Sequence, residues 1–443
     1  MLSPVAKAQF SSVMAYDAGI TNGGATIVRN MSATEVVTYV YTGGKHRFTY
    51  ENNTTLAYSF FDLPTPSAFD KIEIHDFRII NDVLYFCGRD LNANTGVLGT
   101  FKAIDMLNPV GTTVQVDYFD VPNTTMLNRM EAYADPTASG NPRVAAVGYL
   151  YGSCGASACG VWVDCEGFAP GSMTANVSVF DSYYGTPNDY ELWEDVVSTN
   201  DWVVLVGFGQ MGGQQKMILR RFPKGNPTDP EIDNMYLYDE REIVATNETR
   251  AVAIKTNDLA VAYRGVRSDN TTDFTKFRIF DINWMKNINS QEYVIPYKSY
   301  LWEMAYMERA NRVVVLNDFP TPAFLSNFVY LIPYQSTTYN SVFVNDDDWH
   351  FYSVTNLDGN FFVGAGPFHF LLRDASAAYP ANSVAPPPAL CPADDVMKVG
   401  IINNVVSNKI IEPLSGLNYP GIIPSQETDT IYSGSLTTRC FSY

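Results

Sequence analysis

Phe60-Phe61-Asp62 closes a strand-like run with an acidic residue, and this kind of ending returns along the chain. Further copies are Met14-Ala15-Tyr16-Asp17, Tyr118-Phe119-Asp120, Val179-Phe180-Asp181, Leu237-Tyr238-Asp239 and Val344-Asn345-Asp346. Endings that recur at intervals of tens of residues indicate stacked or radially repeated structural units. The repeat, rather than any single motif, therefore decides the fold class.

Short apolar runs that follow turn residues repeat with a similar period. Val83 to Gly88 follows Asn81-Asp82, and Val203 to Phe208 follows Asn200-Asp201. Comparable turns stand at Asn141-Pro142, Asn257-Asp258, Asn311-Arg312 and Asp358-Gly359. The runs are almost continuously apolar, which is typical of strands buried on both faces. Asn, Asp and Gly favour tight hairpin turns because they tolerate positive φ.

Each repeat contains four predicted strands. In the second repeat they span 72–80, 83–88, 97–105 and 113–120. Four short antiparallel strands per repeat, without a helix-period segment, predict an all-β fold of about seven β-propeller blades. A β-sandwich also contains short strands, but it does not need the same signatures to recur at this period.

The two ends of the repeat array complement each other. The last repeat predicts strands at 350–355, 360–364 and 368–373, and then runs into Ala- and Pro-rich sequence. The segment 9–17 has an Asp-ended strand with no repeat before it. We expect this N-terminal strand to pair beside 368–373 and close the last blade, because such pairing removes exposed sheet edges.

A C-terminal extension follows the predicted propeller. We assign residues 1–375 to the propeller and 376–443 to an extension that contains a Pro-rich connector and a tail. The six cysteines are interpreted as structural disulfides, since the Cys-x4-Cys spacing is not a zinc pattern and no histidine lies nearby. The expected pairs are Cys154–Cys159, Cys87–Cys165 and Cys391–Cys440. Disulfides favour an oxidising compartment, so we expect an extracellular or cell-surface protein.

In architecture the chain resembles the seven-bladed β-propeller superfamily over roughly residues 1–375. The motifs of its named families are absent: there is no Gly-His…Trp-Asp repeat, no kelch double-Gly pattern and no Ser-x-Asp-x-Gly-x-Thr box. Aromatic-rich blades with Asn-Asp turns and few lysines are similar to those of secreted bacterial surface proteins. The resemblance implies a fold and a location, and a fold alone does not imply a function.

Composition excludes several classes of partner. The net charge is -18 with only 29 Lys and Arg, so the surface repels phosphate backbones and we expect no nucleic-acid partner. No apolar run approaches the ~20 residues that span a bilayer. The cluster Asp346-Asp347-Asp348 is interpreted as a solvated turn, because the spacing of an EF-hand loop is absent. No metal or cofactor is expected.

Charged residues on the predicted first strands are the candidates for catalysis, because these strands line the channel of a propeller. They are Glu73, His75, Asp76, Arg129, Glu131, Glu194, Asp195, Arg250, Glu303 and His350. Glycosidases place two carboxylates about 5–10 Å apart, but no motif selects such a pair here. Nucleophile motifs such as Gly-x-Ser-x-Gly are also absent. We therefore expect hydrated channel residues and no enzyme activity.

Three tryptophans at the starts of repeats are the binding candidates: Trp193, Trp302 and Trp349. They either fill the wedges between blades or form a platform that stacks on a sugar or a protein. We predict a non-enzymatic extracellular module that binds or adheres to protein or glycan. The alternatives are a structural subunit of an extracellular filament or virion, whose tail docks on a neighbouring copy, and a glycan-cleaving enzyme that uses channel carboxylates.

Overall fold

The structure, a computed structural model of the 443-residue chain, is all-β throughout the residues it describes. These residues are 10–17, 27–42, 45–52, 58–64, 71–102, 115–137, 142–151, 158–166, 176–181, 190–211, 214–226, 233–237, 242–267, 273–288, 293–295, 300–308, 312–319, 325–331, 340–345, 351–357, 360–365, 368–374, 397–400, 412–413 and 438–441. The chain divides into two compact units. One is Met1–Leu63 with Trp302–Tyr443, and the other is Pro64–Leu301.

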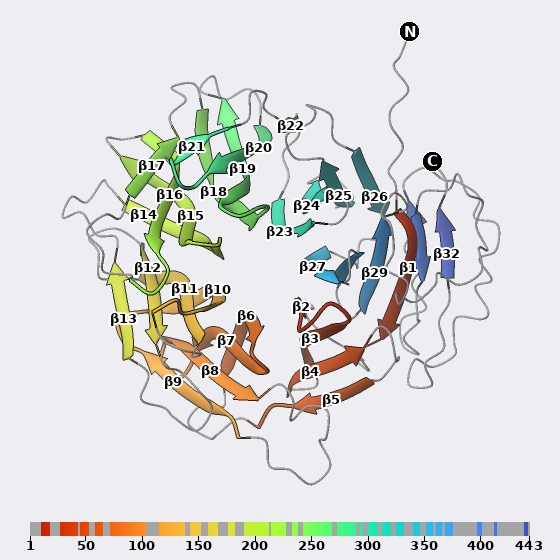
Figure 1. Cartoon of the computed structure of the whole chain (residues 1–443), viewed down its shortest axis with the longest axis horizontal. Helices are drawn as coiled ribbons and strands as arrows, with labels where there is room; N and C mark the ends of the chain where they lie inside the picture. The colour runs from red at the N-terminus through yellow and green to blue at the C-terminus, as the bar shows by residue number, and fades with distance from the viewer. Residues whose placement is uncertain are drawn as a thin grey trace. The chain divides into compact units, whose positions relative to one another are not determined.

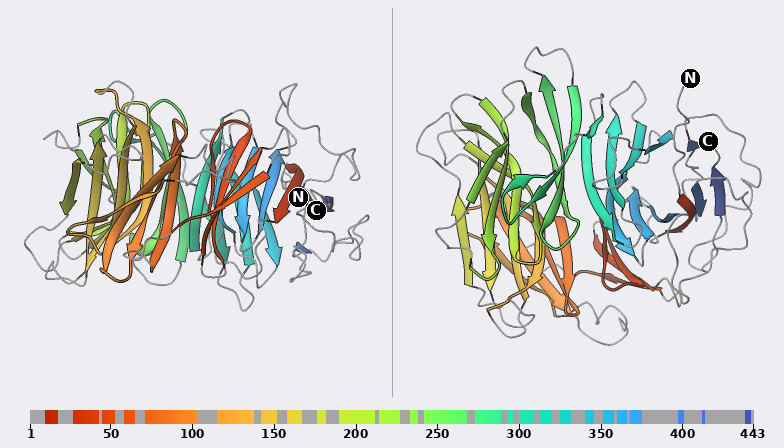
Figure 2. Two further views of the ribbon diagram at one scale, coloured as in Figure 1. Left: turned by 90° about the horizontal axis from the view of Figure 1, so that it is seen from below. Right: turned by 45° about the horizontal axis from the view of Figure 1, so that its top comes forward.

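The unit Pro64–Leu301 contains four consecutive antiparallel sheets, β6 to β9, β10 to β13, β14 to β17 and β18 to β22. Their strands are β6 Ile72–Ile80, β7 Val83–Asp90, β8 Thr95–Lys102, β9 Asp117–Val121, β10 Met126–Ala134, β11 Pro142–Tyr151, β12 Ala158–Glu166, β13 Asn176–Asp181, β14 Tyr190–Ser198, β15 Trp202–Met211, β16 Gln214–Pro223, β17 Asp233–Leu237, β18 Glu242–Ala253, β19 Asp258–Arg267, β20 Asp273–Asp281, β21 Lys286–Asn287 and β22 Tyr293–Ile295. The first three of these sheets are meanders in which every strand pairs with the next. The fourth strands β9 and β13 lie at the outer edge of this unit (Figure 1). Figure 2 shows its strands from the side, with the connecting loops at their ends.

The other unit contains three sheets of the same kind and a strand pair. Its strands are β1 Phe10–Asp17, β2 Ile27–Asn30, β3 Glu35–Thr42, β4 Lys45–Asn52, β5 Tyr58–Asp62, β23 Tyr300–Met307, β24 Arg312–Phe319, β25 Leu325–Leu331, β26 Asn340–Asn345, β27 Phe351–Leu357, β28 Asn360–Ala365, β29 Phe368–Asp374, β30 Met397–Gly400, β31 Glu412–Pro413 and β32 Thr438–Phe441. The predicted pairing of the N-terminal strand with the last strand of the repeat array is present. β1 runs antiparallel to β29, with Val13 opposite Leu372. The described strands of the extension also pair within this unit: β31 adds to β26, and β30 pairs with β32.

Consecutive four-stranded meanders are the blades of a β-propeller, which confirms the predicted fold class. The hairpin between β6 and β7 shows how the sequence specifies them. Asn81 and Asp82 both have positive φ, of 50° and 59°, as a tight two-residue turn requires. The sheet of the fifth repeat departs from the pattern, since β21 and β22 both pair with β20 in place of a single fourth strand.

Apolar side chains fill the contacts between successive sheets. The second strand β15 is buried continuously from Val203 to Phe208, as the sequence predicts for a strand covered on both faces. Val204 and Val206 pack against Leu259 and Val261 of the next sheet. Within the unit Pro64–Leu301, successive sheets therefore bury their faces against one another, and a blade is not expected to be stable alone.

The structure tests one of the three predicted cysteine pairs. Cys87 and Cys165 are free and fully buried, so the predicted Cys87–Cys165 bridge is wrong. Both belong to the apolar cluster between the β6–β9 sheet and the β10–β13 sheet, where a buried thiol packs as a small apolar residue. Burial raises the pKa of both thiols and keeps them protonated.

The other two pairings remain predictions. Cys159 at the start of β12 is disulfide-bonded, but Cys154, its expected partner, lies outside the described residues. Cys440 lies on β32, and Cys391 falls outside the part of the chain that the structure describes.

The recurring Asp has a structural role at the end of the fourth strand. Asp62 lies opposite Arg47 of the third strand and accepts hydrogen bonds from Arg47 Nε at 2.7 Å and Lys45 Nζ at 3.2 Å. Asp120 is equivalent and accepts a hydrogen bond from Thr95 Oγ1 at 2.9 Å. These contacts fasten the outer strand to its neighbour by a side-chain bond in addition to the ladder.

Asp62→Asn is expected to reduce the acid sensitivity of folding. Burial raises the pKa of Asp62, but the bonds and charges of Arg47 and Lys45 outweigh burial and lower that pKa below its ordinary 3.8. A lowered folded-state pKa stabilises the protein above the ordinary value, and that stability is lost as the pH falls through the lowered value. For a partly exposed pair we expect at most about 1 kcal/mol at pH 7. Urea unfolding between pH 7 and pH 3 measures it. Asp82→Asn, in the exposed turn before β7, is the matched control, and equal pH slopes in both variants would contradict the prediction.

Candidate functional site

The first strand of each of three successive sheets carries a β-bulge at the same place. The register moves from Ile74–Gly88 to Asp76–Cys87, from Leu127–Gly148 to Arg129–Val147, and from Trp193–Gly207 to Asp195–Val206. The extra residues are His75, Asn128 and Glu194. A bulge redirects the side chain of the extra residue and is common beside functional sites.

A glycine on the second strand faces each bulge, at Gly88, Gly148 and Gly207. A Cβ atom there would lie 1.7 to 2.0 Å from a backbone carbonyl oxygen of the first strand. No side chain fits at such a distance, so glycine allows the two backbones to approach where the bulge narrows the gap. The bulge and its glycine therefore form one repeated device.

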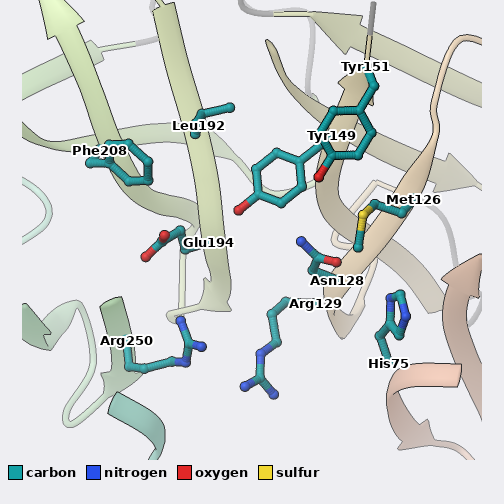
Figure 3. A pocket seen from close by; sticks show the side chains of 10 residues that line it. All are labelled: His75, Met126, Asn128, Arg129, Tyr149, Tyr151, Leu192, Glu194, Phe208 and Arg250. Atoms are coloured by element: carbon teal, nitrogen blue, oxygen red, sulfur yellow. The ribbon is translucent and has the colours of Figure 1, made fainter. Parts of the chain in front are cut away.

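The three bulge residues line one cavity of about 630 Å³ (Figure 3). Its walls come from the first strands of four consecutive sheets and the second strands of two of them. The lining residues are His75, Met126, Asn128, Arg129, Tyr149, Tyr151, Leu192, Glu194, Phe208 and Arg250. Arg129 and Arg250 extend along one side of the cavity, and Tyr149 and Tyr151 lie on the other.

Two guanidinium groups and one carboxylate give this cavity an excess of positive charge inside an acidic protein. Glu194 Oε2 accepts a hydrogen bond from Thr249 N at 2.6 Å, and Arg250 Nη1 donates to Thr249 O at 2.7 Å. The backbone N–H and C=O of one residue, Thr249 of β18, therefore hold both charged side chains in place.

His75 is held as a neutral ring. Its Nδ1–H donates to Leu127 O at 2.8 Å, because a carbonyl can only accept, so Nε2 is left as the acceptor of the neutral imidazole. Burial lowers the pKa of His75, and the charge of Arg129 lowers it further, while Leu127 O and Glu73 oppose them. At neutral pH the His75 ring is therefore uncharged, and its Nε2 atom lies 3.7 Å from the Glu73 carboxylate.

The tyrosines combine a buried and an exposed ring. Burial raises the pKa of Tyr149, and the nearby charge of Glu194 raises it further, so its hydroxyl stays protonated and hydrogen-bonds with Asn128. Tyr151 is 48% exposed, and its ring centroid lies 6.1 Å from that of Tyr149. Tyr151 therefore presents an aromatic face to solvent beside the cavity.

The other first-strand acids are engaged in hydrogen bonds. Asp76 Oδ2 accepts from Met130 N of the next sheet at 3.2 Å, and Asp195 Oδ2 accepts from Ala251 N of the next sheet at 3.0 Å. Each acid directly follows a bulge residue and accepts a hydrogen bond from the next sheet, so it fastens one blade to the next. In the other unit, Ser353 Oγ accepts from Val28 N in the same manner.

The remaining acids form ion pairs or face solvent. Glu131 pairs with Arg78 Nε at 3.2 Å, and Glu303 is buried against Arg29 Nη2 at 2.9 Å. Glu73 is exposed, with its carboxylate 3.7 Å from His75 Nε2. His350 lies outside the described residues.

Of the three tryptophans predicted to bind a ligand, the structure places Trp193 in the core. Trp193 is 0% exposed and packs in the core between the β10–β13 sheet and the β14–β17 sheet. The Arg220 guanidinium lies 5.2 Å from its ring centroid. The packing role therefore fits Trp193 better than a stacking role. Trp302 lies half-buried on β23, and Trp349 falls outside the described residues.

Four cavity residues belong to the first-strand candidates that the sequence predicts, namely His75, Arg129, Glu194 and Arg250, and the other six do not. The signal was the glycine at the end of each second-strand run, in Cys87-Gly88, Val147-Gly148 and Val206-Gly207. Each of these glycines pairs with the first-strand residue that directly precedes the bulge residue. Gly148, for example, pairs with Leu127, and the next residue is Asn128.

Neither a metal cluster nor a membrane-crossing helix is found within the described ranges. No group of three or more His, Cys, Asp or Glu side chains there could hold a metal ion. No helix in that part of the chain is long and apolar enough to cross a membrane.

Comparison with known proteins bears on the fold. No family model and no curated protein matches the sequence. Raptor from Chaetomium thermophilum is similar with a TM-score of 0.51 at 12% identity, over 84% of this chain and 30% of the Raptor chain. The β-propeller domain of the Trilobed protease from Pyrococcus furiosus is similar with a TM-score of 0.44 at 8% identity, over 86% of this chain and 99% of that one. Extracellular domains 1-2 of Drosophila Semaphorin 1b are similar with a TM-score of 0.45 at 7% identity, over 83% of this chain and 88% of that one. Function has to be argued from the site, because such identities concern the fold alone.

Proposed function

We propose that this protein is a non-enzymatic, extracellular binding module whose ligand is a glycan held in the cavity around Arg129 and Arg250. The observation that carries the proposal is the bulge device, which directs a polar side chain from each of three successive blades into one cavity. Polar groups that converge among aromatic and apolar walls are the usual composition of a small-ligand site.

The size of the cavity favours a small ligand or the end of a larger one. About 630 Å³ falls within the roughly 300–1,000 Å³ typical of small-molecule sites. A stable protein interface needs about 800 Å² from each partner. A terminal sugar can enter such a cavity while the rest of the glycan remains outside.

Binding without cleavage is favoured by the distribution of carboxylates. Glu194 is the carboxylate among the lining residues, and a glycosidase of the usual kind needs a pair. Asp76 and Asp195 instead accept backbone hydrogen bonds that join blades. The proposal therefore predicts that a retained glycan is recovered intact.

A glycan array probed with the full chain tests this function. We expect retention of a defined set of glycans, and loss of most of that retention in Asn128→Ala, which removes a cavity amide that bonds to Tyr149. Trp284→Ala, which changes a ring that is 79% exposed and outside the cavity, is the control and should retain them. Absence of retention, equal retention by both variants, or shortening of the bound glycan would contradict the proposal.

A further inference from the structure

We infer that the cavity selects a sugar that carries a carboxylate, such as a uronic acid or a sialic acid. The inference rests on the proposed function, since it names the ligand class of the same cavity. Three features carry it: the local charge, the way the guanidinium groups are held, and the neutral groups opposite them.

The local charge runs against that of the whole chain. The protein carries -18, so its surface as a whole repels anions, yet two of the ten cavity residues are arginines and one is an acid. The two guanidinium groups therefore make the lining of this cavity attractive to an anion, unlike the surface as a whole.

The guanidinium of Arg250 is oriented before any ligand arrives. Its Nη1 donates to Thr249 O, and the N–H of the same residue, Thr249, donates to Glu194. A guanidinium carries its five N–H donors in a planar fork, and the geometry of this fork matches a carboxylate with two parallel bonds. The Arg129 guanidinium extends along the same side of the cavity (Figure 3).

The neutral residues of the cavity suit a polyhydroxylated ring rather than a simple anion. Tyr151 offers an exposed aromatic face, on which the C–H face of a pyranose can stack. Asn128 and the Tyr149 hydroxyl can exchange hydrogen bonds with sugar hydroxyls. The cavity therefore has a charged side for the carboxylate and a neutral side for the ring.

Calorimetry with matched sugars tests the inference on the full chain. The probes are glucuronate against glucuronamide and glucose, galacturonate against galactose, and N-acetylneuraminate against its methyl ester, with acetate as a plain anion. We expect at least one acid to bind about tenfold or more tighter than its neutral partners and than acetate. Arg129→Gln and Arg250→Gln should each remove about tenfold of that affinity, and leave any binding of the neutral sugars within about threefold. Lys255→Gln removes a cation from an exposed position outside the cavity and should change nothing. Thermal unfolding of each variant confirms that it is folded.

Three other outcomes would overturn the carboxylate, the sugar, or the proposed function as a whole. Equal affinity for an acid and its neutral partner, lowered alike by Asn128→Ala, would overturn the carboxylate inference and leave the proposed function in place. Acetate that binds as tightly as the acids would overturn the sugar and leave only an anion site. Failure of every sugar to bind, together with an empty glycan array, would overturn the proposed function and the inference together.

Discussion

Arg143→Met is expected to destabilise the protein by about 3–5 kcal/mol, because it leaves two buried carboxylates without their cation. Arg143 Nη1 lies 3.0 Å from Asp135 Oδ2, and Nη2 contacts Asp164 Oδ2. The Tyr133 hydroxyl donates to Asp164 Oδ1 at 3.0 Å. The exposed fraction is 6% for the side chain of Arg143 and 1% for each of the two acids, so water cannot replace the lost partner.

The effect of pH separates this mechanism from lost packing. Burial raises the pKa of Asp164 above its ordinary value even with Arg143 beside it. Without Arg143 the pKa of Asp164 should rise further. A raised folded-state pKa of an acid costs stability above the ordinary value and relieves that cost as the pH falls, since the folded form binds the proton more tightly. The difference between wild type and Arg143→Met should therefore shrink on acidification.

Denaturant unfolding followed by tryptophan fluorescence measures both effects, with midpoint and slope compared for each variant. The matched control is the double variant Arg143→Met/Asp164→Leu, which removes one carboxylate together with the cation. It should lose less stability than the single variant, since the uncompensated charge is the main cost. A single variant that loses less than about 1 kcal/mol, or a double variant that loses more than the single, would contradict the assignment.

The blade pattern was predictable because it depends on residues that are close together in the sequence. A two-residue turn needs positive φ, and Asn81-Asp82 supplies it; an outer strand needs a partner for its end, and Asp62 supplies it. Such features depend on neighbours within one hairpin, so they recur in each repeat and can be read from spacing alone. The pairing of β1 with β29 followed from counting strands at the two chain ends.

The cavity was harder to predict because its residues come from four sheets. His75 and Arg250 are distant in sequence, and which of many polar first-strand residues meet depends on the bulges that turn them inward. The same limit explains the wrong cysteine pair. Cys87 and Cys165 do share one apolar cluster, as adjacency of blades suggests, but membership of a cluster does not bring two sulfur atoms to bonding distance.

Gly148→Ala is expected to cost about 2–4 kcal/mol of stability and to disturb the cavity as well. The added Cβ would lie 1.9 Å from Met126 O, and a backbone carbonyl cannot rotate away without breaking the strand pair. Alanine in a strand is otherwise favoured over glycine by about 0.5–1 kcal/mol, so any loss measures the clash and not propensity. The strands can relieve the clash by giving up the bulge at Asn128, which would turn Asn128 away from the cavity.

Gly99→Ala separates these two effects, because it is the same substitution at a glycine that faces no bulge. Its Cβ would lie 2.0 Å from Phe86 Cζ, so a buried ring has to move, and stability should fall, while the cavity is not involved. Methyl spectra of 13C-methionine-labelled protein distinguish the variants. The Met126 methyl, on the cavity wall, should shift in Gly148→Ala and stay in place in Gly99→Ala. If Gly148→Ala loses stability with an unmoved Met126 signal, the glycine serves strand packing alone and the bulge does not depend on it. If both variants move that signal, the cavity responds to blade packing in general rather than to the bulge device.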